Sequence, residues 1–435
     1  MKKKWILGVL CCALTLGGNA PAAPRAEGGE TLTIADAEGL KAFASEVNGG
    51  RSFKGQTVKL TADILLNDTA GWRTWNRATV GKKQWTPIGT KEHPFEGTFD
   101  GAGHAIAGLF IKAGSESMYQ GLFGCVQSAV IKHTTIRYSH ILGYNFVGGF
   151  AGRASLHTLF LGCSQEGIVE AERNFAGGMA GFTEKFVRML DCRNTGQVSG
   201  HRCVGGMTGY FDSGSIYNCY NRGTVSGRYE HVGGIVGEYS EAYYKRVTKA
   251  DGFKSMPNDT LANCYNTGTV SARDVAGGIA GYISLNYIDN TVLKAVVANN
   301  YSTGKLSTAY PVVTDGLVGA YMYFGSRNRL YVPSISRIER DGGPCYWSEE
   351  SCKIVETDRP RFEGGRISTD SYIDAASGIT EIPKDFTFFE EAKMKQPDFL
   401  GLLNEWVDKS GTTVFHRWRL DTNNENQGFP VFDIK

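Results

Sequence analysis

Stacked catalytic carboxylates would place acidic residues at equivalent positions of a repeat. The acidic residues of this 435-residue chain do not recur in that way. Hydrolysis of a glycosidic bond needs two carboxylates a few ångströms apart. A polysaccharide lyase needs a base and a group, often Ca²⁺ held by clustered acids, that neutralises the uronate. Glu166 and Glu170 are near neighbours, but the next copy of the chain's repeat has Gln197 and Ser199 near those positions. The sequence therefore predicts no row of acids.

Other catalytic and metal-binding motifs are missing as well. The eight histidines show no metal-ligand spacing, and neither a Gly-x-Ser-x-Gly nor a Walker motif occurs. The formal net charge of +2 excludes a strongly basic nucleic-acid binder. We therefore expect no enzyme activity, no cofactor, no metal and no nucleic acid. The alternative is a carbohydrate-active enzyme whose acids, such as Asp212, Glu238 and Glu241, come together only on folding.

A glycine-rich phrase organises residues 120–320. Residues 147–152, Val-Gly-Gly-Phe-Ala-Gly, return with their first glycine at 177, 205, 233 and 277, and degenerate copies start at Gly121 and Gly316. The first glycines at 148, 177, 205 and 233 are 29, 28 and 28 residues apart, whereas the next two copies follow after 44 and 39. Such self-similarity is the signature of a solenoid, and two of its units carry insertions.

A second phrase follows the first in each unit, as in Cys192–Ser199, Cys219–Ser226 and Cys264–Ser271. Short apolar runs, β-branched residues and Gly/Asn turns without a helical period indicate three short strands per unit. Units of this kind stack with a rise of about 4.8 Å per coil. We therefore predict an all-β fold, a parallel, right-handed β-helix with coils of about 28 residues.

Cysteines recur at one position of the repeat. They are Cys163, Cys192, Cys219 and Cys264. We expect an interior ladder of small buried side chains, and disulfides between adjacent coils are the alternative. Asn194, Asn221 and Asn266 tolerate left-handed turns and are expected to stack as an amide ladder. Cys345 and Cys352 lie off the ladder, and they either close a small loop or stay unpaired.

Three segments, 239–262, 283–298 and 321–344, follow the glycine strand of their coils. Insertions at equivalent points of a solenoid emerge on one side and often form its binding face. Their tyrosines and arginines suit recognition of sugars or protein surfaces, although packing on the solenoid flank is the competing interpretation. The candidate binding residues are Tyr239, Tyr243, Tyr244, Arg246, Tyr321, Tyr323, Arg327, Arg329 and Tyr331. Trp72 and Trp75, in a loop before the repeats, are a second candidate platform.

The two ends differ in composition from the repeats. Residues 1–22 have three lysines, a short apolar core and an Ala-x-Ala site, which predicts a secretory signal peptide. A lipoprotein signal at Cys11 or Cys12 is the weaker alternative. Residues 23–364 are assigned to the β-helix, with a capping helix over 36–47 that starts at Asp36 and precedes a first strand at 57–60. Residues 365–435 are assigned to a C-terminal cap with a helix over 397–407 and a strand over 429–434.

The repeats resemble the GLUG motif of large bacterial secreted and surface proteins, including regions beside the catalytic domain of IgA-specific metallopeptidases. The resemblance is specific over 120–320, and it extends to Trp85–Gly89, Phe95–Gly101 and Gly428–Pro430. It implies a β-helix on an exported protein, and it supplies no catalytic residues. The metallopeptidase's His-Glu-x-x-His motif is absent from this sequence.

These observations lead to one main expectation about function. We expect a non-catalytic bacterial protein, secreted or at the cell surface, that binds a glycan or a host or matrix protein through its inserted loops. The alternatives are a periplasmic location, a polysaccharide lyase or glycoside hydrolase, and a purely structural stalk. No apolar segment of membrane-spanning length follows the signal region.

Overall fold

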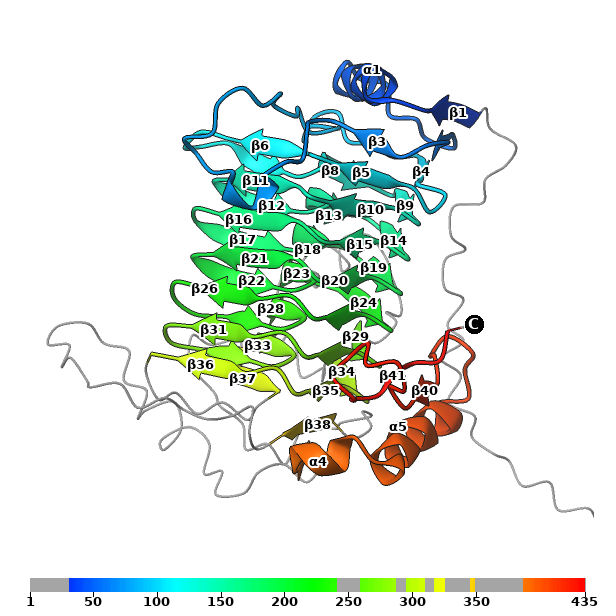
Figure 1. Ribbon diagram of the computed structural model, residues 1–435, viewed down its shortest axis with the longest axis vertical. Helices are drawn as coiled ribbons and strands as arrows, with labels where there is room; N and C mark the ends of the chain where they lie inside the picture. Colours follow the sequence, from blue (N-terminus) through cyan, green and yellow to red (C-terminus); the bar gives the residue numbers. More distant parts are fainter. Residues whose placement is uncertain are drawn as a thin grey trace, which may run out of the picture.

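The computed structural model describes residues 31–240, 259–286, 295–309, 317–324, 345–348 and 386–434. Short strands follow one another around a coil, and successive coils stack along one axis (Figure 1). Each complete coil adds one strand to each of five parallel sheets, here called sheets 1 to 5 in chain order. Sheets 3 and 5 each contain seven strands, so the stack has about seven turns. The prediction of a parallel β-solenoid is confirmed.

Sheets 1 and 2 are the longest, because strands from both ends of the chain extend them. Sheet 1 contains β1 (Thr31–Ile34), β2 (Thr57–Leu60), β4 (Thr98–Asp100), β9 (Val130–Lys132), β14 (Leu159–Leu161), β19 (Val187–Leu190), β24 (Gly214–Tyr217), β29 (Asp259–Ala262) and β34 (Ala295–Ala298). Sheet 2 contains β3 (Ile64–Leu65), β5 (Ala105–Ala107), β10 (Thr135–Arg137), β15 (Ser164–Gln165), β20 (Arg193–Asn194), β25 (Tyr220–Asn221), β30 (Tyr265–Asn266), β35 (Tyr301–Ser302), β38 (Cys345–Ser348) and β39 (Phe386–Phe389).

The other three sheets complete each coil. Sheet 3 contains β6 (Phe110–Lys112), β11 (His140–Gly143), β16 (Ile168–Ala171), β21 (Gln197–Gly200), β26 (Val225–Gly227), β31 (Val270–Ala272) and β36 (Leu306–Thr308). Sheet 4 contains β7 (Met118–Gln120), β12 (Asn145–Gly148), β17 (Asn174–Gly177), β22 (Arg202–Gly205), β27 (Val232–Gly233) and β32 (Ala276–Gly277). Sheet 5 contains β8 (Phe123–Gln127), β13 (Ala151–Ser155), β18 (Ala180–Glu184), β23 (Thr208–Phe211), β28 (Val236–Ser240), β33 (Ala280–Asn286) and β37 (Val318–Phe324).

The glycine phrase spans a corner between two strands, so the prediction of three strands per unit was wrong. β12 ends at Gly148 and β13 begins at Ala151, and the two residues between them turn the chain. A Cβ on Gly149 would lie 2.3 Å from the carbonyl oxygen of Gly178 in the next coil. Glycine is needed there because the coils approach backbone to backbone.

The core runs along the inside of the stack and is closed at its first end by α1 (Ala37–Asn48). The Asp36 carboxylate accepts a hydrogen bond of 2.8 Å from the Gly39 N–H, which confirms the predicted N-cap. Phe43 of α1 is buried against the rings of Phe53, Phe95 and Phe99. The strand predicted at 57–60 is also confirmed, as β2. It is not the first strand, because β1 precedes the helix and pairs with β2 in sheet 1.

The two predicted ladders lie next to each other. The cysteine ladder is at the corner between sheets 1 and 2, and the asparagine ladder is in the sheet 2 strands that follow. The four repeat cysteines, Cys163, Cys192, Cys219 and Cys264, are buried unpaired thiols. The amide of Asn194 donates to Asn221 and that of Asn221 donates to Asn266, each over 2.7 Å, as an amide ladder requires. These asparagines are in strands, however. The left-handed turn belongs to the residue before the cysteine, such as Asn218, whose φ is 52°.

The C-terminal residues 386–434 pack on the flank of the last coils. They contain α4 (Glu391–Met394), α5 (Pro397–Lys409) and an antiparallel pair, β40 (Trp418–Arg419) and β41 (Val431–Phe432) (Figure 1). Their apolar side chains cover Tyr265 and Tyr301 on the outside of sheet 2. The helix predicted over 397–407 is confirmed, whereas the strand predicted over 429–434 is limited to β41. The predicted boundaries 1–22, 23–364 and 365–435 stay predictions.

An outer row of asparagines anchors this C-terminal unit. Asn218, Asn263 and Asn299 occupy one position in three successive coils. The amide of Asn263 donates to Asn218 Oδ1 and that of Asn299 donates to Asn263 Oδ1, each over 2.8 Å. Their amides also donate to the carbonyl oxygens of Val414, His416 and Leu403. The same corner of the solenoid thus satisfies backbone groups of the unit that folds back onto it.

Candidate functional site: an aromatic strip that ends in a Cys-His-Glu cluster

Tyr239, a predicted binding residue, lies inside the solenoid. It is fully buried, with its ring centroid 5.2 Å from that of Phe211 in the neighbouring coil. Strand residues alternate between two faces, so β28 turns Tyr239 inward and Glu238 outward. Its assignment to the binding face was therefore wrong. Tyr321 and Tyr323 belong to β37, in register with Ile283 and Leu285 of β33.

The remaining loop candidates lie outside the described residues. They are Tyr243, Tyr244, Arg246, Arg327, Arg329 and Tyr331. Glu241, Cys352 and the predicted signal peptide also lie outside them. The binding role of these loop residues stays a prediction.

Trp72 and Trp75 form a packed cluster and not an exposed platform, so this prediction was also wrong. Trp72 is the first residue of the short 3₁₀ helix Trp72–Thr74, and Trp75 directly follows that helix. The two residues are only 9% and 5% exposed. Trp75 packs edge-on against Phe110, and Trp72 packs against Tyr138. Their loop covers the outer side of sheet 3 in the early coils, where burial of indole area explains their presence.

Sequence reasoning missed a strip of aromatic rings on the outside of sheets 4 and 5. Its rings are half-buried and belong to no part of the apolar core. They are Tyr119, Phe146, Phe175, Phe182 and Tyr210. The first three come from successive strands of sheet 4, and the other two from successive strands of sheet 5. We call these five residues the aromatic strip.

The rings of the strip stack along the solenoid axis. Phe146 and Phe175 have centroids 5.0 Å apart and planes within 4° of parallel, and Phe182 and Tyr210 are 4.8 Å apart and within 7°. Between the two columns the rings meet edge to face, as Phe146 does with Phe182 at 5.4 Å. Each ring of the strip is thus stacked on at least one face by a neighbour from an adjacent coil, and the stacking along the solenoid axis turns ring edges outward.

A left-handed backbone conformation holds one of these columns outward. Phe146 and Phe175 have φ of 57° and 67°, which is uncommon for bulky residues. The same position in the next two coils is filled by Cys203, with φ 53°, and His231, with φ 62°. The glycine pair that follows each of them lets the coil turn immediately afterwards. This repeated geometry makes one continuous surface column.

Cys203, His231 and Glu238 form a polar cluster at the end of the strip. The carboxylate oxygen Oε2 of Glu238 accepts hydrogen bonds from the Cys203 thiol over 3.1 Å and from His231 Nδ1 over 2.9 Å. The Cys203 Sγ is 3.9 Å from the same His231 nitrogen. Cys203 is 6% exposed, and the side chains of His231 and Glu238 are 20% and 19% exposed. The ring of Tyr282 stacks on His231 at 4.1 Å.

The charges in this cluster follow from its burial and contacts. Burial, reinforced by the nearby Glu238 carboxylate, raises the pKa of the Cys203 thiol well above its usual range. Burial also tends to raise the pKa of Glu238, but its hydrogen bonds to His231 and Cys203 outweigh this, and its pKa is lowered. At neutral pH the thiol is therefore protonated and the carboxylate ionised.

This arrangement does not match an activated cysteine nucleophile. In such a site the histidine lies between the thiol and the acid and uses one ring nitrogen for each. Here the thiol and the carboxylate approach the same nitrogen, Nδ1 of His231. The thiol also donates directly to the carboxylate. The three side chains converge on one point, which is the geometry of a ligand set.

The acids proposed for a carbohydrate-active site do not form an exposed pair among the described residues. Asp212 is fully buried, with Ser213 Oγ 3.3 Å from its Oδ2. Glu238 is engaged by Cys203 and His231, and Glu241 lies outside the described residues. Asp212 and Glu238 therefore do not form the exposed acid and base pair that glycoside hydrolysis requires.

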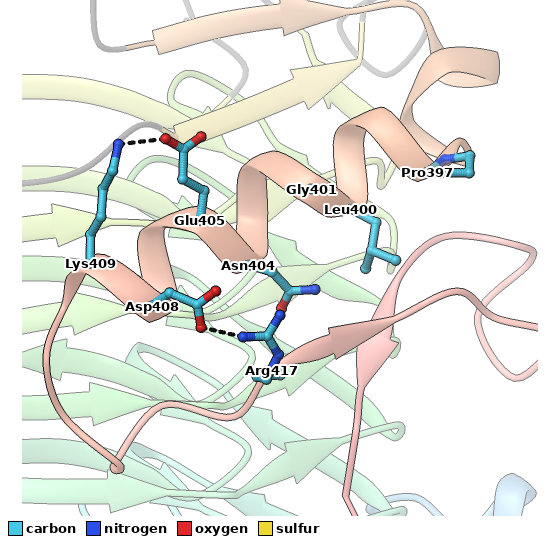
Figure 2. A pocket seen from close by; sticks show the side chains of 8 residues that line it. All are labelled: Pro397, Leu400, Gly401, Asn404, Glu405, Asp408, Lys409 and Arg417. Carbon is cyan, nitrogen blue, oxygen red and sulfur yellow. Dashed lines mark hydrogen bonds and ion pairs between the residues drawn. The ribbon is translucent and has the colours of Figure 1, made fainter.

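A shallow hollow on the C-terminal unit is a weaker candidate site (Figure 2). It has a volume of about 570 Å³ along the outer side of α5. Its charged side chains already pair with each other, Lys409 with Glu405 and Arg417 with Asp408 (Figure 2). The Asn404 side-chain amide donates a hydrogen bond to the Trp418 carbonyl oxygen and accepts one from the Trp418 N–H. With these groups satisfied, the hollow offers no convergent polar site.

The comparisons with known proteins concern the fold. No protein-family model and no curated protein matches the chain. A "putative immunoglobulin A1 protease" from Bacteroides ovatus has a similar solved structure, with 19% sequence identity and a TM-score of 0.48, over 92% of this chain and 91% of that one. The resemblance to GLUG repeats stays a prediction. No helix among the described residues is both long and apolar enough to cross a membrane.

Proposed function

We propose that this protein is a non-catalytic, exported binding protein that captures a partner protein through the aromatic strip. The observation that carries the proposal is the contiguous row of five half-buried rings outside the core. Rigid aromatic side chains supply large contact area at low entropic cost, and they are enriched where proteins bind each other. An open strip of this kind extends across four coils, which suits an elongated partner segment.

Ring orientation favours a protein partner over a glycan. A sugar packs the C–H groups of one side of its ring flat on an aromatic face. In the strip at least one face of each ring is stacked on a ring of an adjacent coil, such as Phe146 on Phe175, which reduces the flat area open to a sugar. The exposed ring edges carry partial positive charge and suit aliphatic side chains, the faces of partner aromatic rings, and carboxylates.

Exposed arginines beside the strip add a preference for acidic partners. Arg173 is two residues before Phe175, and Arg202 is next to Cys203; both are exposed, as is Arg228. Burial and the positive charges of Arg202, Arg173 and Arg228 lower the pKa of His201. The His201 N–H donates to the Arg173 carbonyl oxygen over 2.7 Å, and the Arg228 N–H donates to the Gly200 carbonyl oxygen over 3.0 Å, so the backbones of these residues are neighbours. Arg202 is paired with Glu230 at 3.0 Å. We therefore propose a partner segment in which acidic residues flank apolar ones.

The test is a capture assay with the chain lacking residues 1–22. Immobilised host and matrix proteins and polysaccharides would be probed with this chain and with a Phe146→Ser/Phe182→Ser variant. A second variant, Arg173→Glu, reverses an exposed charge whose guanidinium carbon lies 5.9 Å from the centroid of the Tyr144 ring. The matched control is Tyr138→Ser, because Tyr138 is a 43% exposed ring on a different side of the solenoid.

We expect protein capture that falls about tenfold or more in the two strip variants, weakens with salt for an acidic partner, and is unchanged in the control. Circular dichroism and thermal melting would show that each variant is folded.

Capture that is equal in all variants would contradict the strip as the binding surface and favour the inserted loops. New sugar ends in the polysaccharide wells would contradict a non-catalytic role. Retention on polysaccharides alone would point to a glycan ligand, and no retention would leave a structural stalk.

A further inference from the structure

We infer that Cys203, His231 and Glu238 form a binding site for zinc or a similar borderline divalent cation. The inference goes beyond partner capture and does not depend on it. It rests on three potential ligand atoms of different chemistry, Sγ, Nδ1 and Oε2, which all lie within 4.8 Å of one another. These are the three ligand types that proteins use for zinc.

The repeat explains how the three side chains meet. Cys203 and His231 occupy the same position in successive coils, because Val204 is in register with Val232. Glu238 occupies the position that Tyr210 fills one coil earlier. In the coils before this point, the same two columns carry the rings of the aromatic strip. The solenoid thus replaces aromatic contacts by a compact ligand set at one level of the stack.

The distances between the ligand atoms are close to those around a tetrahedral ion. Bond lengths of about 2.3 Å to sulfur and about 2.0 Å to nitrogen or oxygen place such ligands about 3.3–3.6 Å apart. The observed separations are 3.9 Å between Sγ and Nδ1, 3.1 Å between Sγ and Oε2, and 2.9 Å between Nδ1 and Oε2. Shifts of a few tenths of an ångström convert the hydrogen-bonded triangle into one face of a coordination tetrahedron.

The charges of the cluster also suit a divalent cation. On binding, the Cys203 thiol loses its proton to solvent. His231 also releases the Nδ1 proton that it donates to Glu238, and it takes up a proton from solvent on Nε2, so the neutral imidazole binds through Nδ1. Thiolate, carboxylate and a dication then sum to zero charge, which limits the cost of burying the site. A single carboxylate does not suit Ca²⁺ or Mg²⁺, which take oxygen ligands, whereas a thiolate and an imidazole select zinc and its chemical relatives.

Two features would position such an ion. The stacked ring of Tyr282 fixes the plane of the His231 imidazole, as outer contacts often do for metal ligands. The partial exposure of His231 and Glu238 gives solvent access to a fourth position for water or an added ligand. Because Cys203 belongs to one coil and the other two residues to the next, the ion would cross-link adjacent coils.

The experiment titrates the metal-free chain, lacking residues 1–22, with Co²⁺ and then displaces the cobalt with Zn²⁺. We expect one ion per chain, a thiolate-to-cobalt charge-transfer absorption in the near ultraviolet and the visible bands of tetrahedral cobalt. Cys203→Ala and His231→Phe should abolish these bands and weaken zinc binding about tenfold or more, since even loss of an outer-shell contact costs that much. Zinc should raise the Tm of the wild-type chain and not that of these variants.

The repeat itself provides variants that are expected to fold. Phe146 and Phe175 fill the position of His231 in earlier coils, so His231→Phe restores a residue that this geometry already accommodates. The matched control is Cys125→Ala, because Cys125 is a buried thiol in the sheet 5 column that contains Glu238. Absence of thiolate-cobalt absorption in the wild type, or unchanged absorption in His231→Phe and Cys203→Ala, would overturn the inference.

Discussion

Replacement of Asn263 by alanine should release the C-terminal unit from the solenoid. The Asn263 side chain is fully buried and takes part in four hydrogen bonds. It donates to Asn218 Oδ1 over 2.8 Å and to the His416 carbonyl over 3.0 Å, and it accepts from Asn299 and from the Trp418 indole over 2.8 Å each. Two of these bonds hold the unit directly.

The expected loss can be estimated from these contacts. A buried hydrogen bond contributes about 1 kcal/mol net, and alanine at the φ of 54° that Asn263 adopts costs about 1 kcal/mol more. The sum is about 4–5 kcal/mol, and we expect about 4 kcal/mol because some freed groups re-pair with water. A loss of this size is comparable to the stability of a small domain, so local release should precede global unfolding.

Hydrogen exchange measured by mass spectrometry is the assay, because it reports on each segment separately. Protection should fall across residues 397–432 and persist in sheets 3 to 5. The control is Asn194→Ala, which removes an amide of the other ladder whose bonds go to Gly196 and Asn221. It should weaken the solenoid by about 1–2 kcal/mol and leave the C-terminal protection unchanged. Unchanged protection of 397–432 in Asn263→Ala would refute the anchoring role of the outer asparagines.

Three further outcomes are expected. Gly223→Ala should lower the Tm strongly in a thermal melt, because its Cβ would lie 1.7 Å from the Gly196 carbonyl oxygen of the adjacent coil; an unchanged Tm would contradict this backbone approach. Burial opposes ionisation of Asp421, but three backbone N–H donors outweigh it and hold the pKa of this carboxyl below the ordinary 3.8. The ionised carboxylate therefore stabilises the fold above about pH 4, and this stabilisation is lost as the pH falls through the lower, folded-state pKa. Melts between pH 2 and about 5 should therefore show a weaker acid dependence for Asp421→Asn than for the wild type, and parallel curves would contradict this. Trp75→Ala should lower the free energy of unfolding in urea by about 3 kcal/mol, because it removes packing on Phe110, and it should leave partner capture intact.

The repeat in the sequence was sufficient to predict the stacked coils and their interior. Glycine pairs, cysteines and asparagines recur at a fixed spacing, and a solenoid converts that spacing into ladders without any other information. The N-cap at Asp36 and the helix at 397–407 were also readable, because both depend on neighbours within a few residues. The number of strands per coil was not, since the corners depend on contacts between backbones of different coils.

The sequence by itself thus determined the repeating architecture of this protein, because local patterns fix which residues point into a stack of equal coils. Tertiary structure decided the surface. A left-handed backbone turns Phe146, Phe175, Cys203 and His231 outward, although side chains in or next to a short apolar strand are usually predicted to be buried. Cys203 and Glu238 are 35 residues apart, and they meet because one full coil and part of the next bring them together. The C-terminal unit lies on a flank because asparagines and tyrosines aligned by stacking offer hydrogen bonds and apolar area there.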